Sequence, residues 1–336
     1  MAVLVSGGMG YIGSHTTVEL LNAGYDVVIA DDLSNSKELV KDRIKEITGK
    51  EVKFYNVDLT DVEKTEEIFR DNNIDSVIHF AAFKAVGESV EKPLEYYYNN
   101  LTSALVVLKA MKKYRCRNFV FSSSATVYGD AKVVPITEDS PLSTTNPYGS
   151  TKLMIEDMLR DIAKAEKQLN IAILRYFNPV GAHKSGIIGE DPNGIPNNLM
   201  PYITKVAIGE LKQLRVFGND YPTHDGTGVR DYIHVVDLAV GHVKALEKLA
   251  TNPGLVTYNL GTGNGYSVLD VVKAFSEASG REIPYEIVSR RAGDIATCYA
   301  DPKKANEELG WKAERGIKEM CEDSWRWQSN NPKGYN

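Results

Sequence analysis

The sequence predicts an α/β fold, in which a doubly wound parallel sheet is followed by a smaller α/β substrate-binding region. Short apolar runs, the pattern of buried parallel strands, alternate with amphipathic helical segments through the first half of the 336 residues. The first of these runs ends in a glycine-rich turn. Such alternation predicts helices on both faces of the sheet and a ligand at the carboxyl ends of its strands.

Composition and charge argue against several classes of partner. Hydrophobic residues make up 43% of the chain and charged residues 25%, as in ordinary globular proteins. The net charge of −6 and the lack of a Lys/Arg run argue against nucleic acid, and no apolar run approaches the ~20 residues of a membrane span. The three cysteines are widely spaced, and no His or Cys cluster has metal-ligand spacing. We therefore expect a cytoplasmic protein without a metal site.

The first strand, Val3 to Val5, leads into the glycine-rich turn. Gly7, Gly10 and Gly13 form a GxxGxxG variant of the Rossmann-type dinucleotide fingerprint, and a helix is predicted from Tyr11 to about Ala23. Glycine permits the tight turn and the close approach of a pyrophosphate, to which the helix N-terminus offers N–H donors. A simple tight turn is the alternative, but the flanking strand and helix favour a dinucleotide site. The residues expected to contact the cofactor here are Gly7, Gly10, Tyr11, Ile12 and Gly13.

The second strand, Asp26 to Ala30, ends in the two aspartates Asp31 and Asp32. A carboxylate at this place, roughly twenty residues past the glycines, accepts hydrogen bonds from a ribose diol and repels a 2′-phosphate. NAD is therefore expected rather than NADP. Asn35 and Ser36, in the loop that follows, are expected to contact the same cofactor.

Two further strands are predicted at Val52 to Asn56 and Ser76 to His79, on either side of a helix from about Val62 to Asn72. Parallel strands end at one edge of their sheet, so the residues that follow both strands should line the cofactor site. Small residues there let a cofactor lie against the backbone, although tight packing also explains the alanines. The residues concerned are Asp58, Leu59, Phe80, Ala81 and Ala82.

A long helix is predicted from Pro93 to about Tyr114. Its apolar residues recur at helical spacing along one side, at Leu94, Tyr98, Leu101, Leu105 and Leu108. Asn99 and Asn100 interrupt this face near its middle. A polar side chain there is either satisfied in a buried network or directed at a ligand, and both interpretations stay open.

A strand from Asn118 to Phe121 is predicted to deliver three hydroxyls, Ser122 to Ser124, to the edge that carries the glycine turn. A downstream helix, begun by an Asn-Pro pair, then carries Tyr148 and Lys152 one turn apart on one face. A free tyrosine has a pKa near ~10, so its use as a base at neutral pH needs help. A nearby ammonium and an oxidised nicotinamide would both lower that pKa, and Ser124 can hold the reacting hydroxyl.

The alternative is that Tyr148 is a residue at the edge of the core and Lys152 a solvated helix charge, because a YxxxK pair often occurs by chance. The dinucleotide fingerprint and the serines at the strand end favour the catalytic interpretation. We therefore assign Ser124, Tyr148 and Lys152 as catalytic.

Together these features resemble the extended short-chain dehydrogenases/reductases, and nearly the whole chain resembles the UDP-glucose (UDP-galactose) 4-epimerase family. Ser6 stands where that family usually has threonine. The segments that carry the resemblance are Gly7 to His15, Val77 to Gly87, Phe121 to Asp130, Tyr148 to Met154, Leu174 to His183, Gly194 to Tyr202 and Phe217 to Asp237.

The resemblance implies an isomerase reaction. Tyr148 would take the proton of the sugar 4-hydroxyl while the C4 hydride passes to NAD, and the resulting 4-keto sugar would turn over before the hydride returns to its other face. The cofactor is regenerated in each cycle and should stay tightly bound. The further cofactor contacts that the resemblance implies are Lys84, Asn99, Ser122, Tyr148, Lys152, Tyr176 and Phe177.

The resemblance also implies a UDP-sugar site in the second region. Arginine suits such a site because its planar fork meets phosphate oxygens bidentately, although any single arginine can instead form a surface ion pair. Arg230 and Arg291 would pair with the diphosphate, and Asp294 would meet the uridine ribose. The full set of implied substrate contacts is Lys84, Ser124, Tyr148, Asn178, Asn198, Leu199, Arg215, Val216, Phe217, Arg230, Tyr232, Arg291, Asp294 and Cys298.

Cys298 bears on the choice of sugar. It stands where family members restricted to UDP-glucose and UDP-galactose tend to have a bulky tyrosine, and a small residue resembles members that also accept N-acetylated sugars. We therefore expect activity on UDP-GlcNAc and UDP-GalNAc as well. The alternative is that Cys298 is a small core residue and that Tyr299 fills the space.

Three other functions are compatible with parts of this pattern. A nucleotide-sugar 4,6-dehydratase shares the fold and the Tyr/Lys pair, but it needs an Asp-Glu pair where this chain has Ala125-Thr126. A non-catalytic NAD-binding regulator would commonly have lost the tyrosine or the lysine, and both are present. Another NAD-dependent nucleotide-sugar epimerase is a further alternative.

The organisation expected is an NAD-binding domain at residues 1–177, to which later segments at about 230–260 return, and a mainly UDP-sugar-binding region at 178–336. The helices that begin at Pro93 and Tyr148 resemble the pair through which family dimers form a four-helix bundle. A homodimer is therefore expected.

Overall fold

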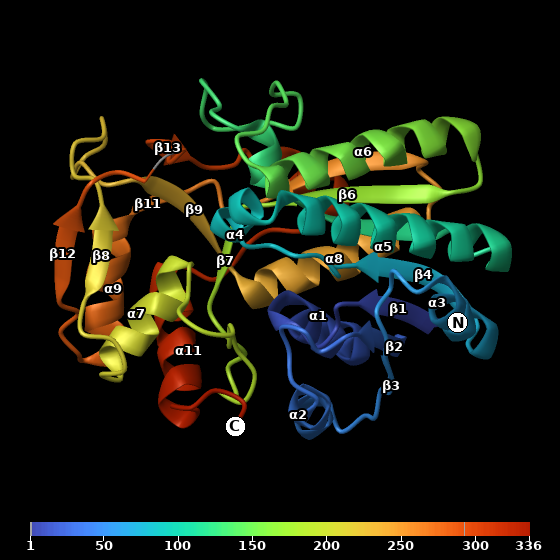
Figure 1. Ribbon diagram of the computed structural model, residues 1–336, viewed down its shortest axis with the longest axis horizontal. Coiled ribbons are helices and arrows are strands. Elements are labelled where there is room, and N and C mark those ends of the chain that lie inside the picture. The colour runs from blue at the N-terminus through green and yellow to red at the C-terminus, as the bar shows by residue number, and fades with distance from the viewer. Residues whose placement is uncertain (1, 292) are drawn as a thin grey trace.

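A computed structural model describes residues 2–291 and 293–336, and its centre is a parallel sheet with the order β10-β6-β5-β4-β1-β2-β3 (Figure 1). Each neighbouring pair of strands runs parallel. The predicted doubly wound sheet is confirmed. Its strands are β1 (Ala2–Ser6), β2 (Asp26–Asp31), β3 (Lys53–Asn56), β4 (Ile74–His79), β5 (Asn118–Ser124), β6 (Asn170–Tyr176) and β10 (Leu255–Leu260).

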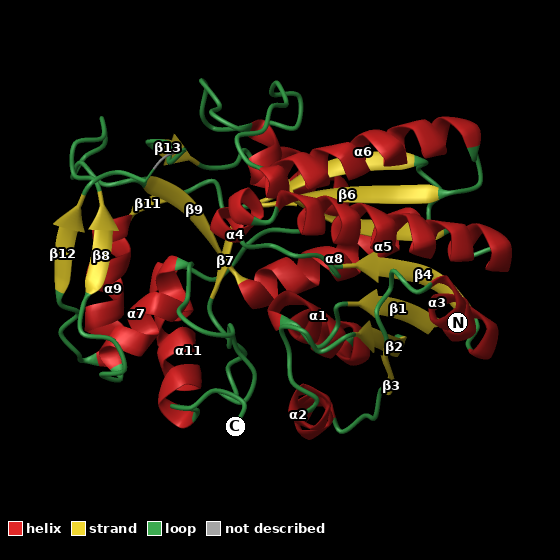
Figure 2. Ribbon diagram, viewed as in Figure 1, coloured by secondary structure: helices red, strands yellow, loops and turns green. Residues whose placement is uncertain are grey.

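Helices cover both faces of this sheet (Figure 2). Alternate residues of a strand point to opposite faces, so Val3 and Val5 enter the core beneath α1, α2 and α8, whereas Leu4 enters the core beneath α3, α5 and α6. The helices are α1 (Tyr11–Asn22), α2 (Leu39–Thr48), α3 (Val62–Asp71), α4 (Val86–Glu91), α5 (Pro93–Tyr114), α6 (Pro147–Ala165) and α8 (Val235–Leu249).

The observed elements differ from the predicted ones in a few places. β5 continues through the three serines, because Ser122 to Ser124 pair in register with Leu174 to Tyr176 of β6. The serines therefore belong to the strand itself and are fixed by its ladder. β6 and the short helices α2 and α4 were not predicted; α2 buries only Val40 and Ile44, which is a weak periodic signal.

The smaller region lies to the left in Figure 1 and has a core of its own. Strands β7 (Asn178–Val180), β9 (Val229–His234), β11 (Gly265–Ser267) and β13 (Thr297–Cys298) form one sheet, and β8 (Leu214–Phe217) pairs with β12 (Tyr285–Val288). The other elements are α7 (Leu199–Ala207), α9 (Val268–Ser279), α10 (Lys303–Leu309), α11 (Ile317–Asn330) and the 3₁₀ helix η1 (Ala125–Tyr128), which follows β5.

The chain crosses between the two regions more than once. β9 belongs to the smaller sheet, and it leads directly into α8, which packs on α1 under the large sheet. β10 then adds an edge strand beside β6. No helix among the described residues is both long enough and apolar enough to cross a membrane.

Candidate active site

The glycine turn lies at the carboxyl end of β1 and packs too closely for side chains. Gly7 has φ +70°, and a Cβ there would lie 2.8 Å from the Ala81 nitrogen. A Cβ at Gly13 would lie 2.2 Å from the Gly7 carbonyl oxygen. Gly10 caps α1 without a side chain to bond the first-turn N–H groups, so these donors are available to an anion. The turn therefore fits a dinucleotide pyrophosphate.

Asp31 binds this turn to the end of β2. Its Oδ2 accepts from the Met9 N–H at 3.0 Å, and its Oδ1 accepts from the Leu33 N–H at 3.0 Å and the Ser36 hydroxyl at 2.7 Å. Burial raises the pKa of Asp31, while these bonds act in the opposite direction. Asp32 is exposed and accepts from Ser34. The sequence did not predict that Asp31 also organises the loop.

The residues expected after β3 and β4 differ in exposure. Asp58 is exposed and Leu59 is buried in the core. The Phe80 ring lies 4.8 Å from the ring of His242, centroid to centroid, and the Ala81 N–H donates to the Ser6 hydroxyl at 3.4 Å. Ala81 and Ala82 are both partly exposed at this edge of the sheet.

The two asparagines of α5 have different roles. Asn100 is buried, accepts from the Phe83 N–H at 2.8 Å and donates to the Thr151 hydroxyl at 3.0 Å. Asn99 is half-buried, and its side chain donates to the side-chain Oδ1 of Asn100 at 3.1 Å. Of the two open interpretations, the buried network holds for Asn100, while Asn99 stays available to a ligand. Lys84 is exposed and lies 3.6 Å from the Glu190 carboxylate.

The fold brings Ser124, Tyr148 and Lys152 together. The Asn146 side chain caps α6 by accepting from the Gly149 N–H at 2.8 Å, which fixes the first turn and with it Tyr148. Lys152 is buried, donates to the Ser122 carbonyl at 2.7 Å, and has its Nζ 5.9 Å from the centroid of the Tyr148 ring. Ser124, at the end of β5, accepts from the Thr126 N–H at 3.2 Å.

Burial sets the protonation of this group. It raises the pKa of Tyr148, and a hydrogen bond with Ser124 lowers that pKa in part. Burial also lowers the pKa of Lys152 to about 7, and none of the ion pairs among the described residues involves Lys152. The lysine was expected to lower the pKa of the tyrosine. It can do so only while it is protonated, and burial makes that proton easy to lose at neutral pH.

Tyr176, the last residue of β6, and Phe177, which follows it, are both buried. The Tyr176 hydroxyl is hydrogen-bonded to His242 Nε2, and interaction with Ser122 lowers its otherwise raised pKa. Phe177 belongs to a small cluster with Val127 and Tyr128, against which Cys298 packs.

Most of the charged residues expected at the UDP-sugar site lie close together, whereas Lys84 lies apart beside Glu190. The Asp294 carboxylate lies 3.0 Å from Arg291 Nε and 3.9 Å from Arg230 Nη2. The Phe217 ring centroid lies 4.6 Å from Arg291 Cζ and 5.9 Å from Arg215 Cζ. An aromatic ring beside guanidinium groups and a carboxylate suits a nucleoside diphosphate.

The other expected substrate residues have less uniform surroundings. Asn178 and Asn198 are exposed, and Leu199 is half-buried. The Val216 and Tyr232 side chains lie in the core of the smaller region, so Val216 can meet a ligand only through its backbone. The pKa of Tyr232 is raised to about 12 because the residue is buried, while the charges of Arg230 and Arg291 act in the opposite direction.

Cys298 lies on β13, paired with Arg230 on β9. It is half-buried, and burial raises the pKa of its thiol to about 11, so the thiol is neutral at physiological pH. The neighbouring Tyr299 turns its ring toward Gly265, whose Cβ would lie 3.4 Å from Tyr299 Cδ1.

One buried ion pair that supports the site has no signal in the sequence. Arg175 of β6 meets Glu156 of α6 at 2.7 Å, and its guanidinium donates to the Tyr128 hydroxyl at 2.8 Å. Glu156 also accepts from the Ser123 hydroxyl at 2.6 Å, so the pair binds α6 to the strand that carries the serines. Partners on different elements have no fixed spacing that sequence analysis can find.

Known proteins share this architecture over the whole chain. The family model described as GDP-mannose 4,6 dehydratase matches residues 4–324. The UDP-glucose 4-epimerase of Bacillus subtilis is 64% identical over 335 residues, covering 100% of this chain and 99% of the relative, and that of Haemophilus influenzae is 65% identical over 336 residues, covering 100% and 99%.

This chain belongs to the UDP-glucose 4-epimerase family.

A solved structure of a family member has the same fold as this chain. The UDP-glucose 4-epimerase from Bifidobacterium longum, in complex with NAD⁺ and UDP, superimposes with a TM-score of 0.97 at 58% identity, covering 99% of this chain and 100% of that one. The membership inferred from the motifs is thereby confirmed. The matching family model is described as a dehydratase. This chain has Ala125-Thr126 directly after Ser124, and neither side chain is a carboxylic acid that could serve an elimination.

Proposed function

We propose that this protein is an NAD-dependent UDP-glucose 4-epimerase that interconverts UDP-galactose and UDP-glucose through a transient 4-keto sugar. The observation that supports this function best is the position of Tyr148. It lies beside Ser124 and the buried Lys152, at the sheet edge that carries the glycine turn. The identity to UDP-glucose 4-epimerases over the whole chain supports it.

Tyr148 acts as base and then as acid at the sugar 4-oxygen. Ser124 hydrogen-bonds the phenol and can hold the sugar hydroxyl in line with it. Lys152, fixed by the Ser122 carbonyl, stabilises the phenolate while it carries its proton. NAD, when bound, supplies a reversible hydride acceptor for C4.

The cofactor site assigned to this reaction spans the carboxyl ends of β1 to β6. The glycine turn would hold the pyrophosphate and the loop after β2 the adenosine ribose. Residues 1–177, with α8 and β10, would form the NAD-binding domain. The proposed contacts are Gly7, Gly10, Tyr11, Ile12, Gly13, Asp31, Asp32, Asn35, Ser36, Asp58, Leu59, Phe80, Ala81, Ala82, Lys84, Asn99, Ser122, Tyr148, Lys152, Tyr176 and Phe177.

The UDP-sugar would lie between this edge and the smaller region. Arg230 and Arg291 would exchange the Asp294 carboxylate for the diphosphate, which frees Asp294 for the ribose hydroxyls. Lys84, Asn178, Asn198 and Leu199 would line the sugar and phosphates. Arg215, Val216 and Phe217 would surround the uracil, with Tyr232 behind the arginines.

N-acetylated UDP-sugars are proposed as additional substrates. Cys298 is small, half-buried and opposite Arg230, and the Tyr299 ring faces Gly265. Space for an acetamido group beside the sugar is what such substrates require.

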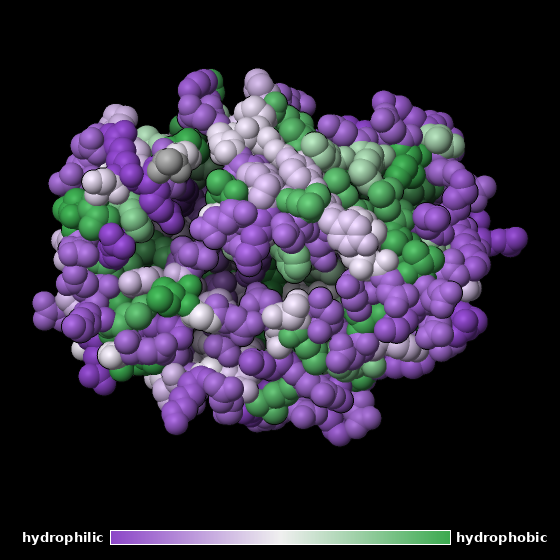
Figure 3. Space-filling view, viewed as in Figure 1, coloured by the Kyte–Doolittle hydropathy of each residue, from purple (hydrophilic) through white to green (hydrophobic). Residues whose placement is uncertain are grey.

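A homodimer is proposed through α5 and α6. Leu94, Tyr98 and Leu105 follow helical spacing on α5 yet are 76%, 65% and 43% exposed, and Met154 of α6 is 45% exposed. Figure 3 shows hydrophobic surface over this part of the molecule. Apolar side chains aligned on two neighbouring helices suit a bundle with a second copy.

NMR of the sugars tests the proposed reaction. UDP-galactose and UDP-GalNAc are incubated separately with the protein, without added cofactor, and their anomeric signals are followed. Appearance of UDP-glucose is expected, because bound NAD is regenerated in each cycle, and appearance of UDP-GlcNAc tests the acetylated substrates. Protein that carries NAD but leaves UDP-galactose unchanged over hours would favour the regulator instead.

A further inference from the structure

A loop segment joins the smaller region to the cofactor-binding loops. We call residues Gly189 to Asn198, between β7 and α7, the bridging segment. In Figure 1 the yellow-green loop between β7 and α7 lies between α11 on one side and α1 and α2 on the other. Its inner contacts are made by Glu190 and Asn193, and its outer contacts by Gly189, Glu190 and Asp191.

The inner contacts reach loops that are assigned to the cofactor. The Asn193 side chain donates to the Ser34 carbonyl at 3.1 Å, and its N–H donates to the Asn35 side chain at 3.5 Å. The Glu190 carboxylate lies 3.6 Å from Lys84 Nζ. Its charge also raises the pKa of Tyr11, which burial has already raised. The segment thus spans from the loop after β2 to the loop after β4.

The outer contacts come from α11 and from the chain beyond it. The Tyr335 hydroxyl accepts from the Gly189 N–H at 3.0 Å and donates to the Gly189 carbonyl at 3.1 Å. The Tyr335 N–H donates to the Asp191 carboxylate at 2.9 Å, and Trp327 Nε1 donates to the Glu190 carbonyl at 3.2 Å. The rings of Trp327 and Tyr335 lie 4.6 Å apart.

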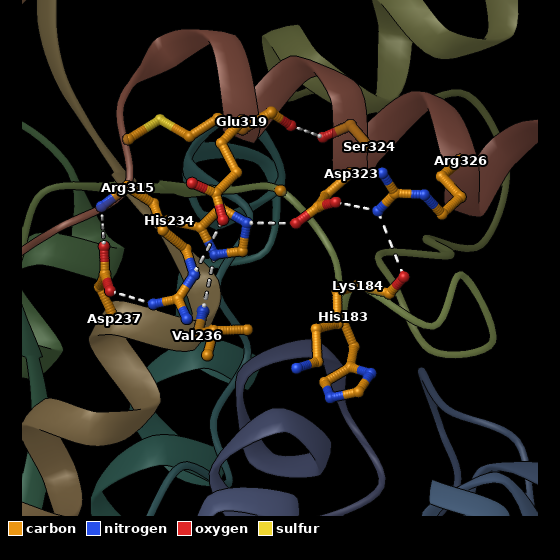
Figure 4. A network of polar contacts seen from close by, with 12 residues as sticks. His183, Lys184, His234, Val236, Asp237, Arg315, Glu319, Asp323, Ser324 and Arg326 are labelled. Atoms are coloured by element: carbon orange, nitrogen blue, oxygen red, sulfur yellow. Dashed lines mark hydrogen bonds and ion pairs between the residues drawn. The ribbon is translucent and has the colours of Figure 1, made fainter.

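Close packing makes these outer contacts specific. A Cβ at Gly189 would lie 2.3 Å from Trp327 Cγ, so only glycine lets the backbone lie against the indole. α11, which carries Trp327, is itself held in place (Figure 4): Asp323 meets the His234 ring at 3.1 Å, and Arg326 donates to the Lys184 carbonyl at 3.2 Å. The outer side is therefore a rigid support for the segment.

We propose that Tyr335 is a positioning residue that holds the bridging segment against the cofactor-binding loops after β2 and β4 and thereby slows the release of NAD. This inference rests on the proposed function, in which the cofactor is regenerated at each turnover and does not need to leave. NAD release would require the loops after β2 and β4 to separate from the segment. Loss of the Tyr335 hydroxyl removes two hydrogen bonds that resist this separation.

Exchange of bound NAD in the holoenzyme tests this role. Protein purified with its NAD is mixed with excess isotopically labelled NAD, and the cofactor retained over time is analysed by mass spectrometry. Tyr335→Phe keeps the ring but loses both hydrogen bonds, so we expect exchange to be about tenfold faster, from the usual strength of such bonds. Gly189→Ala, a second variant, should also speed exchange by displacing the segment from Trp327.

Tyr285→Phe, on an exposed strand of the smaller region, is the matched control and should exchange at the wild-type rate. Wild-type exchange rates in both Tyr335→Phe and Gly189→Ala, with NAD bound throughout, would overturn the inference alone. Wild-type protein that contains no NAD would overturn the proposed function and the inference with it.

Discussion

Lys152 is buried and Tyr148 beside it is partly buried, and burial acts on their pKa values in opposite directions. It raises the pKa of the phenol and lowers that of the amine to about 7. Each group is thereby shifted toward its neutral form, and a bound cation near the ring would favour the phenolate. The pair could be predicted from the sequence because its spacing on one helix is fixed. Its protonation could not, because burial depends on the whole fold.

Removal of the Tyr148 hydroxyl tests its role as acid and base. Tyr148→Phe keeps the ring against Lys152, so we expect NAD content and UDP affinity to stay at wild-type levels. Turnover of UDP-galactose should fall roughly 10² to 10⁴-fold, the usual contribution of a general base. Steady-state kinetics and calorimetry of UDP binding measure both. A turnover within a few-fold of wild type would exclude Tyr148 as the base.

Enlargement of Cys298 tests the proposed sugar range. Cys298→Tyr fills the space beside the sugar, so turnover of UDP-GalNAc should fall at least about tenfold more than that of UDP-galactose, because steric exclusion of one group costs about 1 to 3 kcal/mol. Cys321→Ala, a change at a buried cysteine of the smaller region, is the control for general disturbance. Equal loss on both sugars in Cys298→Tyr would contradict the idea.

Single residues also mark where sequence analysis reached its limit. Asn99 and Asn100 are adjacent on α5, yet only Asn100 is fully buried in a hydrogen-bonded network. Periodicity places both near one face but cannot separate neighbours. The Arg175–Glu156 pair and the Tyr335 contacts join elements that are far apart in sequence, where local patterns carry no information.

The elements of the large sheet were largely predictable, because buried parallel strands and their helices have strong periodic patterns. α5 was predicted from Pro93 to about Tyr114 and is found at those residues. The strands of the smaller sheet have only two to six residues each and come from distant segments. Their pairing is set by tertiary contacts, so the sequence did not indicate it.

The exposed apolar side of α5 gives a prediction about assembly. Leu94→Asp combined with Tyr98→Asp places two charges in the proposed interface, and the double variant should be monomeric by light scattering at concentrations where the wild type is dimeric. Val62→Asp introduces a charge at an exposed apolar residue of α3 and should leave the dimer intact. Monomeric wild type, or a dimeric double variant, would contradict this interface.

At the scale of the whole molecule, the interior holds several neutral histidines. Burial lowers the pKa of His15 and His79 to about 3 and that of His242 to about 4. The unfolded chain binds protons at these sites below its pKa of ~6.5, whereas the folded chain does not until the pH nears 3 to 4. Their contribution to stability is complete above pH ~6.5 and is lost as the pH falls toward those folded values.

We therefore expect the free energy of unfolding to fall by roughly 1 kcal/mol per histidine between pH 7.5 and 5.5. Urea unfolding at both values measures it. His79→Gln should lose less stability over this interval than the wild type, because the variant no longer buries a neutral imidazole at this site. If the free energy of unfolding depended on pH identically in the wild type and in His79→Gln, the claim that His79 is buried in its neutral form would be refuted.

The return of one hydride to the same carbon tests the central claim most directly. UDP-galactose carrying deuterium at C4 is incubated with the protein in ordinary water with excess unlabelled NAD in solution, and the UDP-glucose formed is examined by NMR. Deuterium should remain at C4 in nearly every product molecule, because the retained cofactor accepts it and gives it back. Product with hydrogen at C4 would contradict an epimerisation that proceeds through tightly held NAD.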